Sequence, residues 1–224
     1  MSVLVCLESP CPGQGAKAAE RLARRLSGVV QTIAISAGGA TDSESLAWAL
    51  GRRTFHRIIH LNDASLAKAD FMTVGMVLAE VARRLQVKVV IAGEHSDQEG
   101  QGLVPAALAQ QLRAPVFSRV HAVDIPSDGE QLEIAVSAGD RLCALACPAP
   151  AVLVADASLV DMPEAPDSQS PASEVETMTL AQLDMDASRI VPRPELLGLH
   201  LPIPGARRFC LTPDEAARLM LRRR

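Results

Sequence analysis

The chain has 224 residues, a formal net charge of −4 and 48% hydrophobic residues, enough to bury the core of one α/β domain with an appendage. Aromatic residues make up only 2%, so we expect an aliphatic core and exclude nucleic-acid modules that stack bases on aromatic rings. The slightly acidic charge would not attract a nucleic acid. No apolar run reaches the roughly 20 residues that cross a bilayer, and the N-terminus lacks a signal peptide's basic region. We therefore expect a cytoplasmic protein without membrane insertion.

Strands and helices are predicted to alternate from the N-terminus onward. Buried apolar runs predict strands at 3–7, 29–36, 56–61 and 87–93, and apolar residues at helical spacing predict helices at 15–27, 43–50 and 69–85. The arginines of these helices, Arg24 among them, are expected on solvated sides. Strands that are apolar on both faces and separated by helices are typical of a doubly wound, mostly parallel sheet of the Rossmann-like, adenine-nucleotide-binding type.

The pattern changes after the fourth strand. A helix is predicted near 103–112 and a strand from 115. Asp128-Gly129 and Gly139-Asp140 then predict hairpin turns between short apolar runs. We therefore expect a small antiparallel extension at one side of the parallel sheet.

Charge divides the chain into three parts. Residues 155–187 hold eight acids and no Lys or Arg, whereas residues 188–224 hold eight arginines and three acids. We expect an α/β domain at 1–157, an acidic Pro/Ser-rich linker at 158–178 and a C-terminal arm at 179–224, whose terminal helix begins after Thr212. The arm contains an apolar but irregular stretch, LLGLHLPIP, so it needs a surface to lie on. A partner subunit is the expected surface.

The five cysteines form no C-x-x-C motif, so neither a disulfide framework nor a metal site is predicted. Cys143 and Cys147 lie in a run that reads as a strand, with both thiols on one side.

Candidate site residues follow the predicted strands, because ligands of open parallel sheets bind at the carboxyl ends of the strands. Three loops qualify, beginning at Cys6-Leu7, at Ala37-Gly38 and at Gly93. The third loop is rich in glycine and suits a phosphate, although such glycines also occur without a ligand. Neither a P-loop nor a G-x-G-x-x-G motif is present. A hydrolase that uses His95 has little support, because the sequence shows no Ser or Cys nucleophile and no metal-ligand partner for it.

These elements together resemble the β subunit of electron transfer flavoproteins over nearly the whole chain. VLVCLE is similar to that family's first strand, and SESLAWALGRRTFHRIIHL to its helix ending in "A-L-A-M-G-A-D-R" with the strand that follows. The family's loop "G-K-Q-A-I-D-G-D-T-G-Q-V-G-P" aligns without a gap from Gly93 onward. PAVLVAD and TLAQLDMD resemble the family's later strand and the opening of its C-terminal arm.

The resemblance implies a heterodimer with an electron transfer flavoprotein α subunit, which holds most of the FAD. The β subunit of that family binds AMP or, in bifurcating members, a second FAD. Carried over by position, and with neighbouring loop residues included, the candidate cofactor contacts are Cys6, Leu7, Ala37, Gly38, Gly93, Ser96, Glu99, Gly102, Leu103 and Val104.

The sequence departs from the family pattern at three places. The "N-P-F-D-E" motif is missing, so the wall near the flavin is expected to come from residues such as Leu7 and Cys11. Leu103 and Val104 lack side-chain donors, which counts against AMP. The segment that docks acyl-CoA dehydrogenases falls on Glu164 and on the acidic stretch 170–174, which indicates a different flavin-dependent dehydrogenase.

The sequence therefore predicts an electron carrier subunit without catalytic residues of its own, passing electrons from a dehydrogenase to a downstream acceptor. The alternative is a redox-inactive sensor or structural subunit that binds an adenine nucleotide on the same fold.

Overall fold

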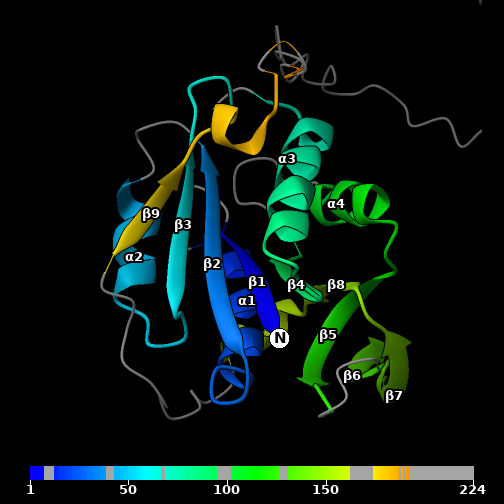
Figure 1. Ribbon diagram of the computed structural model, residues 1–224. Coiled ribbons are helices and arrows are strands. Elements are labelled where there is room, and N and C mark those ends of the chain that lie inside the picture. The colour runs from blue at the N-terminus through cyan, green and yellow to red at the C-terminus, as the bar shows by residue number, and fades with distance from the viewer. Residues whose placement is uncertain are drawn as a thin grey trace, which may run out of the picture. The chain divides into compact units, whose positions relative to one another are not determined.

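Strands and helices alternate in the structure as the sequence predicts. The computed structural model describes residues 1–7, 13–38, 43–66, 69–94, 102–126, 131–161, 174–186, 188 and 190–191. The elements, shown in Figure 1, are β1 (Ser2–Leu7), α1 (Gln14–Arg24), β2 (Gln31–Gly38), α2 (Ser43–Leu50), β3 (Arg57–Asn62), α3 (Phe71–Arg84), β4 (Val89–Gly93), α4 (Val104–Leu112), β5 (Val116–Asp124), β6 (Gln131–Ala138), β7 (Arg141–Pro148), β8 (Ala151–Ala155), the 3₁₀ helix η2 (Ala157–Asp161), β9 (Val175–Met178) and the 3₁₀ helix η3 (Ala181–Leu183). They all belong to one compact unit, Met1–Arg193.

The strands form one sheet of nine, in the order β7-β6-β5-β8-β4-β1-β2-β3-β9. From β5 to β9 neighbouring strands are parallel, and β6 and β7 extend the sheet as antiparallel strands beside β5. The predicted fold class, a doubly wound and mostly parallel sheet with a small antiparallel extension, is confirmed.

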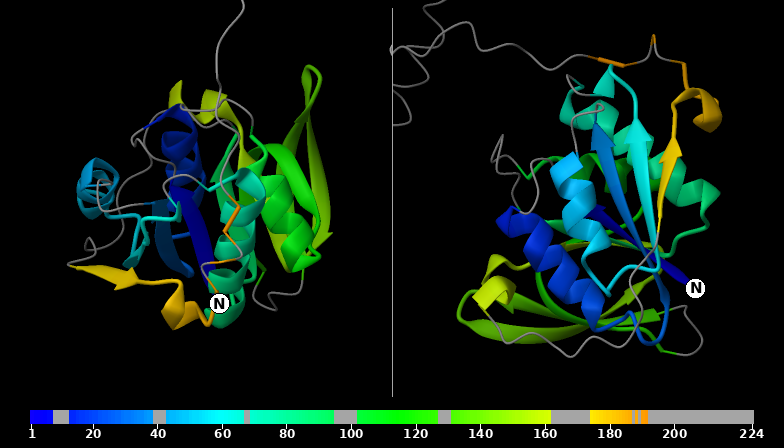
Figure 2. Two further views of the ribbon diagram at one scale, coloured as in Figure 1. Left: turned by 90° about the horizontal axis from the view of Figure 1, so that it is seen from above. Right: turned by 90° about the vertical axis from the view of Figure 1, so that its left-hand side faces the viewer.

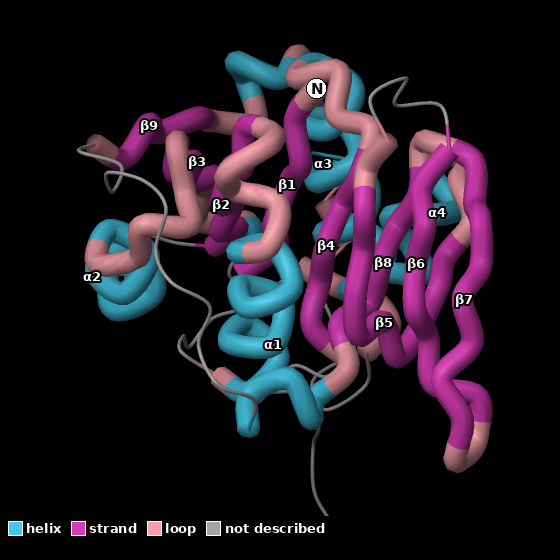
Figure 3. Tube along the Cα trace, turned by 90° about the horizontal axis from the view of Figure 1, so that it is seen from below, coloured by secondary structure: helices cyan, strands magenta, loops and turns pink. Residues whose placement is uncertain are grey.

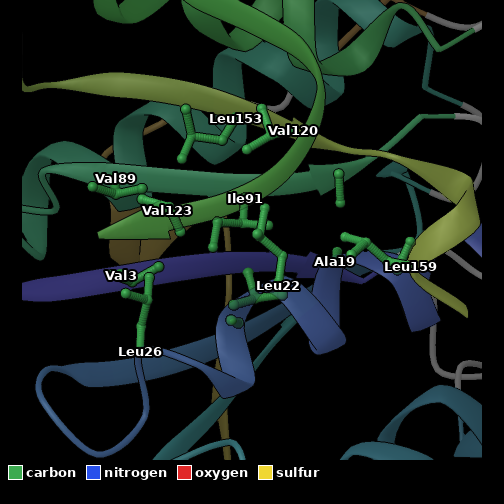
Figure 4. Packing of buried hydrophobic residues seen from close by; sticks show 14 of the residues in the cluster. Val3, Ala19, Leu22, Leu26, Val89, Ile91, Val120, Val123, Leu153 and Leu159 are labelled. Atoms are coloured by element: carbon green, nitrogen blue, oxygen red, sulfur yellow. The ribbon is translucent and has the colours of Figure 1, made fainter. Parts of the chain in front are cut away.

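Helices cover both faces of the parallel part of the sheet. Figures 2 and 3 show α1 and α2 over one face and α3 and α4 over the other. The core beneath α1 is mostly aliphatic, with Phe55 as its one fully buried aromatic residue among those described. Ala19 and Leu22 of α1 are fully buried with Val3 and Ile91 of the sheet, as Figure 4 shows. The alanines of α1 bring the helix axis close to the strands, because they hold it off by only a methyl group.

One arginine that was expected in solvent is buried. Arg24 is 7% exposed, and its Nε and Nη2 donate hydrogen bonds to Oε1 of Glu20, itself 2% exposed, at 3.0 and 2.9 Å. The hydroxyl of Thr54 also donates to this carboxylate. The expectation for Arg24 was wrong, because a buried guanidinium is tolerated where a paired carboxylate satisfies it. The pair ties α1 to the connection between α2 and β3.

The predicted placement of two cysteines in β7 is confirmed. Cys147 is buried in the cluster beneath α1, and Cys143 packs against the same cluster. Both thiols therefore lie on one face of the strand, and burial raises the pKa of the Cys147 thiol.

The segment after residue 174 packs on the domain itself. β9 pairs with β3 from Ile58–Val175 to Leu61–Met178, and Leu180 and Leu183 are buried in the cluster beneath α3. Part of the expected linker is thus a strand, and the first residues of the expected arm belong to the domain's core. Residues 162–173 of the linker and the arm beyond residue 191 lie outside the described residues, so the arm's packing on a partner stays a prediction.

Candidate functional site

The strand order reverses between β1 and β4, and the term crevice denotes the edge where these two strands end and where α1 and α4 begin. Moving along the chain, β2 and β3 are added on one side of β1, whereas β4 lies on its other side. Val5 of β1 pairs with Ile91 of β4, so the two strands end next to each other. In an open α/β sheet such a reversal point is where ligands bind. The loop positions predicted after Cys6 and at Gly93 therefore meet at one edge.

Gly93 lets helix α1 lie directly on the end of β4. A Cβ at this position would be 2.4 Å from Cα of Gly15 and 2.5 Å from its carbonyl carbon. No side chain fits in such a gap, because non-bonded carbon atoms stay about 3.5–4 Å apart. The first turn of α1 thus packs backbone to backbone on the end of β4.

Gly102 has a second, different role. Its φ of +57° lies in the left-handed region, and a Cβ there would be 2.3 Å from the carbonyl oxygen of Glu94. Both constraints select glycine. Glu94 at the end of β4 and Gly102 before α4 are consequently held in contact.

The two helices that begin at this crevice lack side-chain caps. Gly13 at the start of α1 and Leu103 at the start of α4 make no capping hydrogen bond. In contrast, Asp70 caps α3 by accepting a hydrogen bond of 2.7 Å from the N–H of Thr73. The first N–H groups of a helix without a side-chain cap are groups that a ligand, water or a partner can satisfy.

The predicted contacts present few side chains to a ligand. Cys6 and Leu7 are 6% and 5% exposed and pack into the core clusters on opposite faces of the sheet. Gly38 is buried within β2, and Ala37 is half-buried. A cofactor at this edge would therefore meet mainly backbone.

Two further predicted contacts lie at the start of α4. Leu103 is 39% exposed, and Val104 packs against the cluster beneath α3. Ser96 and Glu99 lie outside the described residues, as do His95 and Cys11.

One polar cluster at this edge was not predicted. Asp156 follows β8, the neighbour of β4, and accepts hydrogen bonds from the N–H and hydroxyl of Ser158 at 2.9 and 2.6 Å. Nε2 of His121 lies 3.3 Å from its carboxylate. Burial alone would raise the pKa of Asp156, but the Ser158 hydrogen bonds and the nearby positive charges hold it below its ordinary value. A polar residue directly after a buried strand was the signal that could have identified Asp156.

Metal and membrane sites were also sought among the described residues. No group of three or more His, Cys, Asp or Glu side chains there could hold a metal ion. In the same part of the chain, no helix has the length and apolar character needed to cross a membrane.

Comparison with known proteins identifies the family. The model of the electron transfer flavoprotein domain matches residues 14–183. The chain belongs to the electron transfer flavoprotein family. No curated protein matches it significantly. Electron transfer flavoproteins bind flavin and work with a further subunit of the family and with a dehydrogenase, and the matched residues include α1, β4 and α4 of the crevice.

Proposed function

We propose that this chain is the β subunit of a heterodimeric electron transfer flavoprotein. It helps to hold FAD, most of which is bound by the α subunit, and the complex carries electrons from a dehydrogenase to a downstream acceptor. The chain has no catalytic residue of its own. The resemblance of its loop and strand motifs to the β subunit supports this choice of subunit.

One observation carries the proposal. The crevice edge exposes mainly backbone, because the side chains of Cys6 and Leu7 are buried in the core. Gly93 and Gly102 have no side chain, and backbone atoms of Gly15 and Glu94 pack against them. Such an edge fits a scaffold that borders a cofactor held by another subunit. The uncapped N–H groups at the start of α1 are the chain's candidate donors to such a cofactor.

Bound FAD supplies the redox chemistry of such a complex. The residues of this chain position the partner and keep the edge rigid through the contact between Gly15 and Gly93. The acidic stretch 170–174 supports a donor other than an acyl-CoA dehydrogenase, because the usual docking segment is basic.

Co-expression with a candidate α subunit from the same genome tests the proposal. We expect a yellow complex in which flavin and both chains elute together from size-exclusion chromatography, and in which a dehydrogenase with its substrate bleaches the flavin absorbance. The chain expressed alone is the control. A stable, colourless chain that never co-elutes with a flavoprotein would contradict the proposal. Thermal stabilisation of that lone chain by an adenine nucleotide would instead favour the redox-inactive alternative.

A further inference from the structure

The start of α4 is the place where the resemblance puts a nucleotide phosphate. We infer that in this chain the start of α4 does not bind the phosphate of an adenine nucleotide. The AMP that the resemblance implies therefore does not fit the residues present here. This inference concerns the same edge as the proposed function, but it does not involve the flavin.

The start of α4 is poor in hydrogen-bond donors. A phosphate at a helix N-terminus is held by free backbone N–H groups, often with a hydroxyl or amide side chain. Leu103 occupies the capping position and offers no polar side chain, and Pro105 removes a backbone N–H from the first turn. The aligned family motif has Gln and Gly at these two positions. Two donors that the motif provides are thus absent.

An acceptor lies beside this helix start as well. The carbonyl oxygen of Glu94 is 2.3 Å from where a Cβ of Gly102 would be. This oxygen therefore occupies the space beside Gly102, the residue just before the capping position of α4, and it can only accept a hydrogen bond.

Charge also disfavours a phosphate at this position. Residues 93–112 include three acids and no Lys or Arg. The first cation is Arg113, which follows α4 at its far end, about 13 Å from the helix start by the rise of an α-helix. The sequence of this segment therefore offers a doubly charged phosphate no cation of its own.

Protein contacts already hold this edge together. Gly15 lies on Gly93, Glu94 lies against Gly102, and Val104 is packed against the core beneath α3. The chain makes these contacts by itself, so none of them requires a structural nucleotide.

The first test measures nucleotide directly. The complex with its α subunit is denatured, and released AMP is quantified by chromatography. We expect less than roughly one-tenth of a molecule per chain, since a structural site with a Kd far below the protein concentration stays occupied through purification. AMP released at close to one per chain from the wild-type complex, and lost from the complex with Leu103→Glu, overturns the inference. Flavin is quantified in the same sample, so this failure is separate from a failure of the proposed function.

The second test compares AMP with adenosine in thermal unfolding of the complex. A phosphate-reading site with a Kd of about 50 μM would raise Tm by roughly 5–10 °C at about 5 mM AMP. We expect no more than the shift that adenosine gives. The variant Leu103→Glu shows whether a larger shift comes from the start of α4, because its negative charge would repel a phosphate bound there. The substitution suits folding, since Leu103 is partly exposed and a carboxylate is favourable at a helix start. A shift specific to AMP that Leu103→Glu abolishes overturns the inference, whereas one that survives in this variant arises elsewhere and leaves it standing.

Discussion

Replacing Gly93 with alanine probes the contact between α1 and the end of β4. The added Cβ would lie 2.4, 2.5 and 2.7 Å from Cα, C and O of Gly15, so α1 and β4 must separate by more than about 1 Å to reach ordinary contact distances. Helix α1 has little freedom to move, because Ala16, Ala19 and Leu22 are at most 1% exposed. We expect a loss of about 1–3 kcal/mol, typical of overpacking, and hence a fall in Tm of roughly 2–12 °C.

The matched control for this variant is Gly51→Ala. A Cβ at Gly51 would be 3.4 Å from its nearest neighbour, the carbonyl oxygen of Trp48, so we expect a change within about 0.5 kcal/mol. Both variants are unfolded in urea and by heat and followed by far-UV circular dichroism. If Gly93→Ala unfolds at the same midpoint as Gly51→Ala, the tight contact between α1 and β4 does not exist in solution. If the edge also borders the flavin, Gly93→Ala lowers the flavin content of the complex.

Three further predictions concern buried polar groups and thiols. Glu20→Gln removes the charge that faces the buried guanidinium of Arg24 and should lower the free energy of unfolding by about 3–5 kcal/mol. Glu80→Gln, which alters exposed ion pairs, is the control and should change Tm little. Equal effects of the two variants would contradict the buried pairing. A lowered pKa means that the folded protein favours the ionised carboxylate of Asp156. This contribution to folding stability is present above the unfolded-state pKa and is lost as pH falls below about 4. The Tm difference between wild type and Asp156→Asn should therefore shrink from pH 5 to pH 3. A difference that does not vary with pH would refute this. Iodoacetamide should label Cys143 before Cys147 in the native protein, because Cys147 is buried with a raised pKa; mass spectrometry of the peptides measures the order.

The arrangement of the sheet was largely predictable from the sequence. Buried strands and amphipathic helices differ in the period of their apolar residues, so the alternation up to β4 and the hairpins after it could be read directly. Right-handed crossovers then leave few topologies. The loop positions at Gly93 and Gly102 also followed, because glycines after strands mark the edge where ligands bind.

Features that depend on distant partners could not be read in this way. Arg24 has the same pattern as a solvated helical arginine, and its burial depends on Thr54, 34 residues from Glu20. The role of Gly93 depends on Gly15 at the start of another helix. β9 was missed because it is a short edge strand with Glu176 and Thr177 in an acidic stretch, and edge strands tolerate polar residues that a buried strand excludes.

The late position of β9 in the chain has a consequence for biosynthesis. β9 pairs with β3 across 117 residues, from Ile58 to Val175. Since chains emerge from the ribosome in order, β3 remains an open sheet edge while everything up to Met178 is translated. An open sheet edge is a site for wrong strand pairing. A partner or chaperone that binds the nascent chain would therefore meet β3 while β9 does not yet cover it. Truncation before residue 174 would leave the edge of β3 open permanently, so a shortened form of the chain should still include β9.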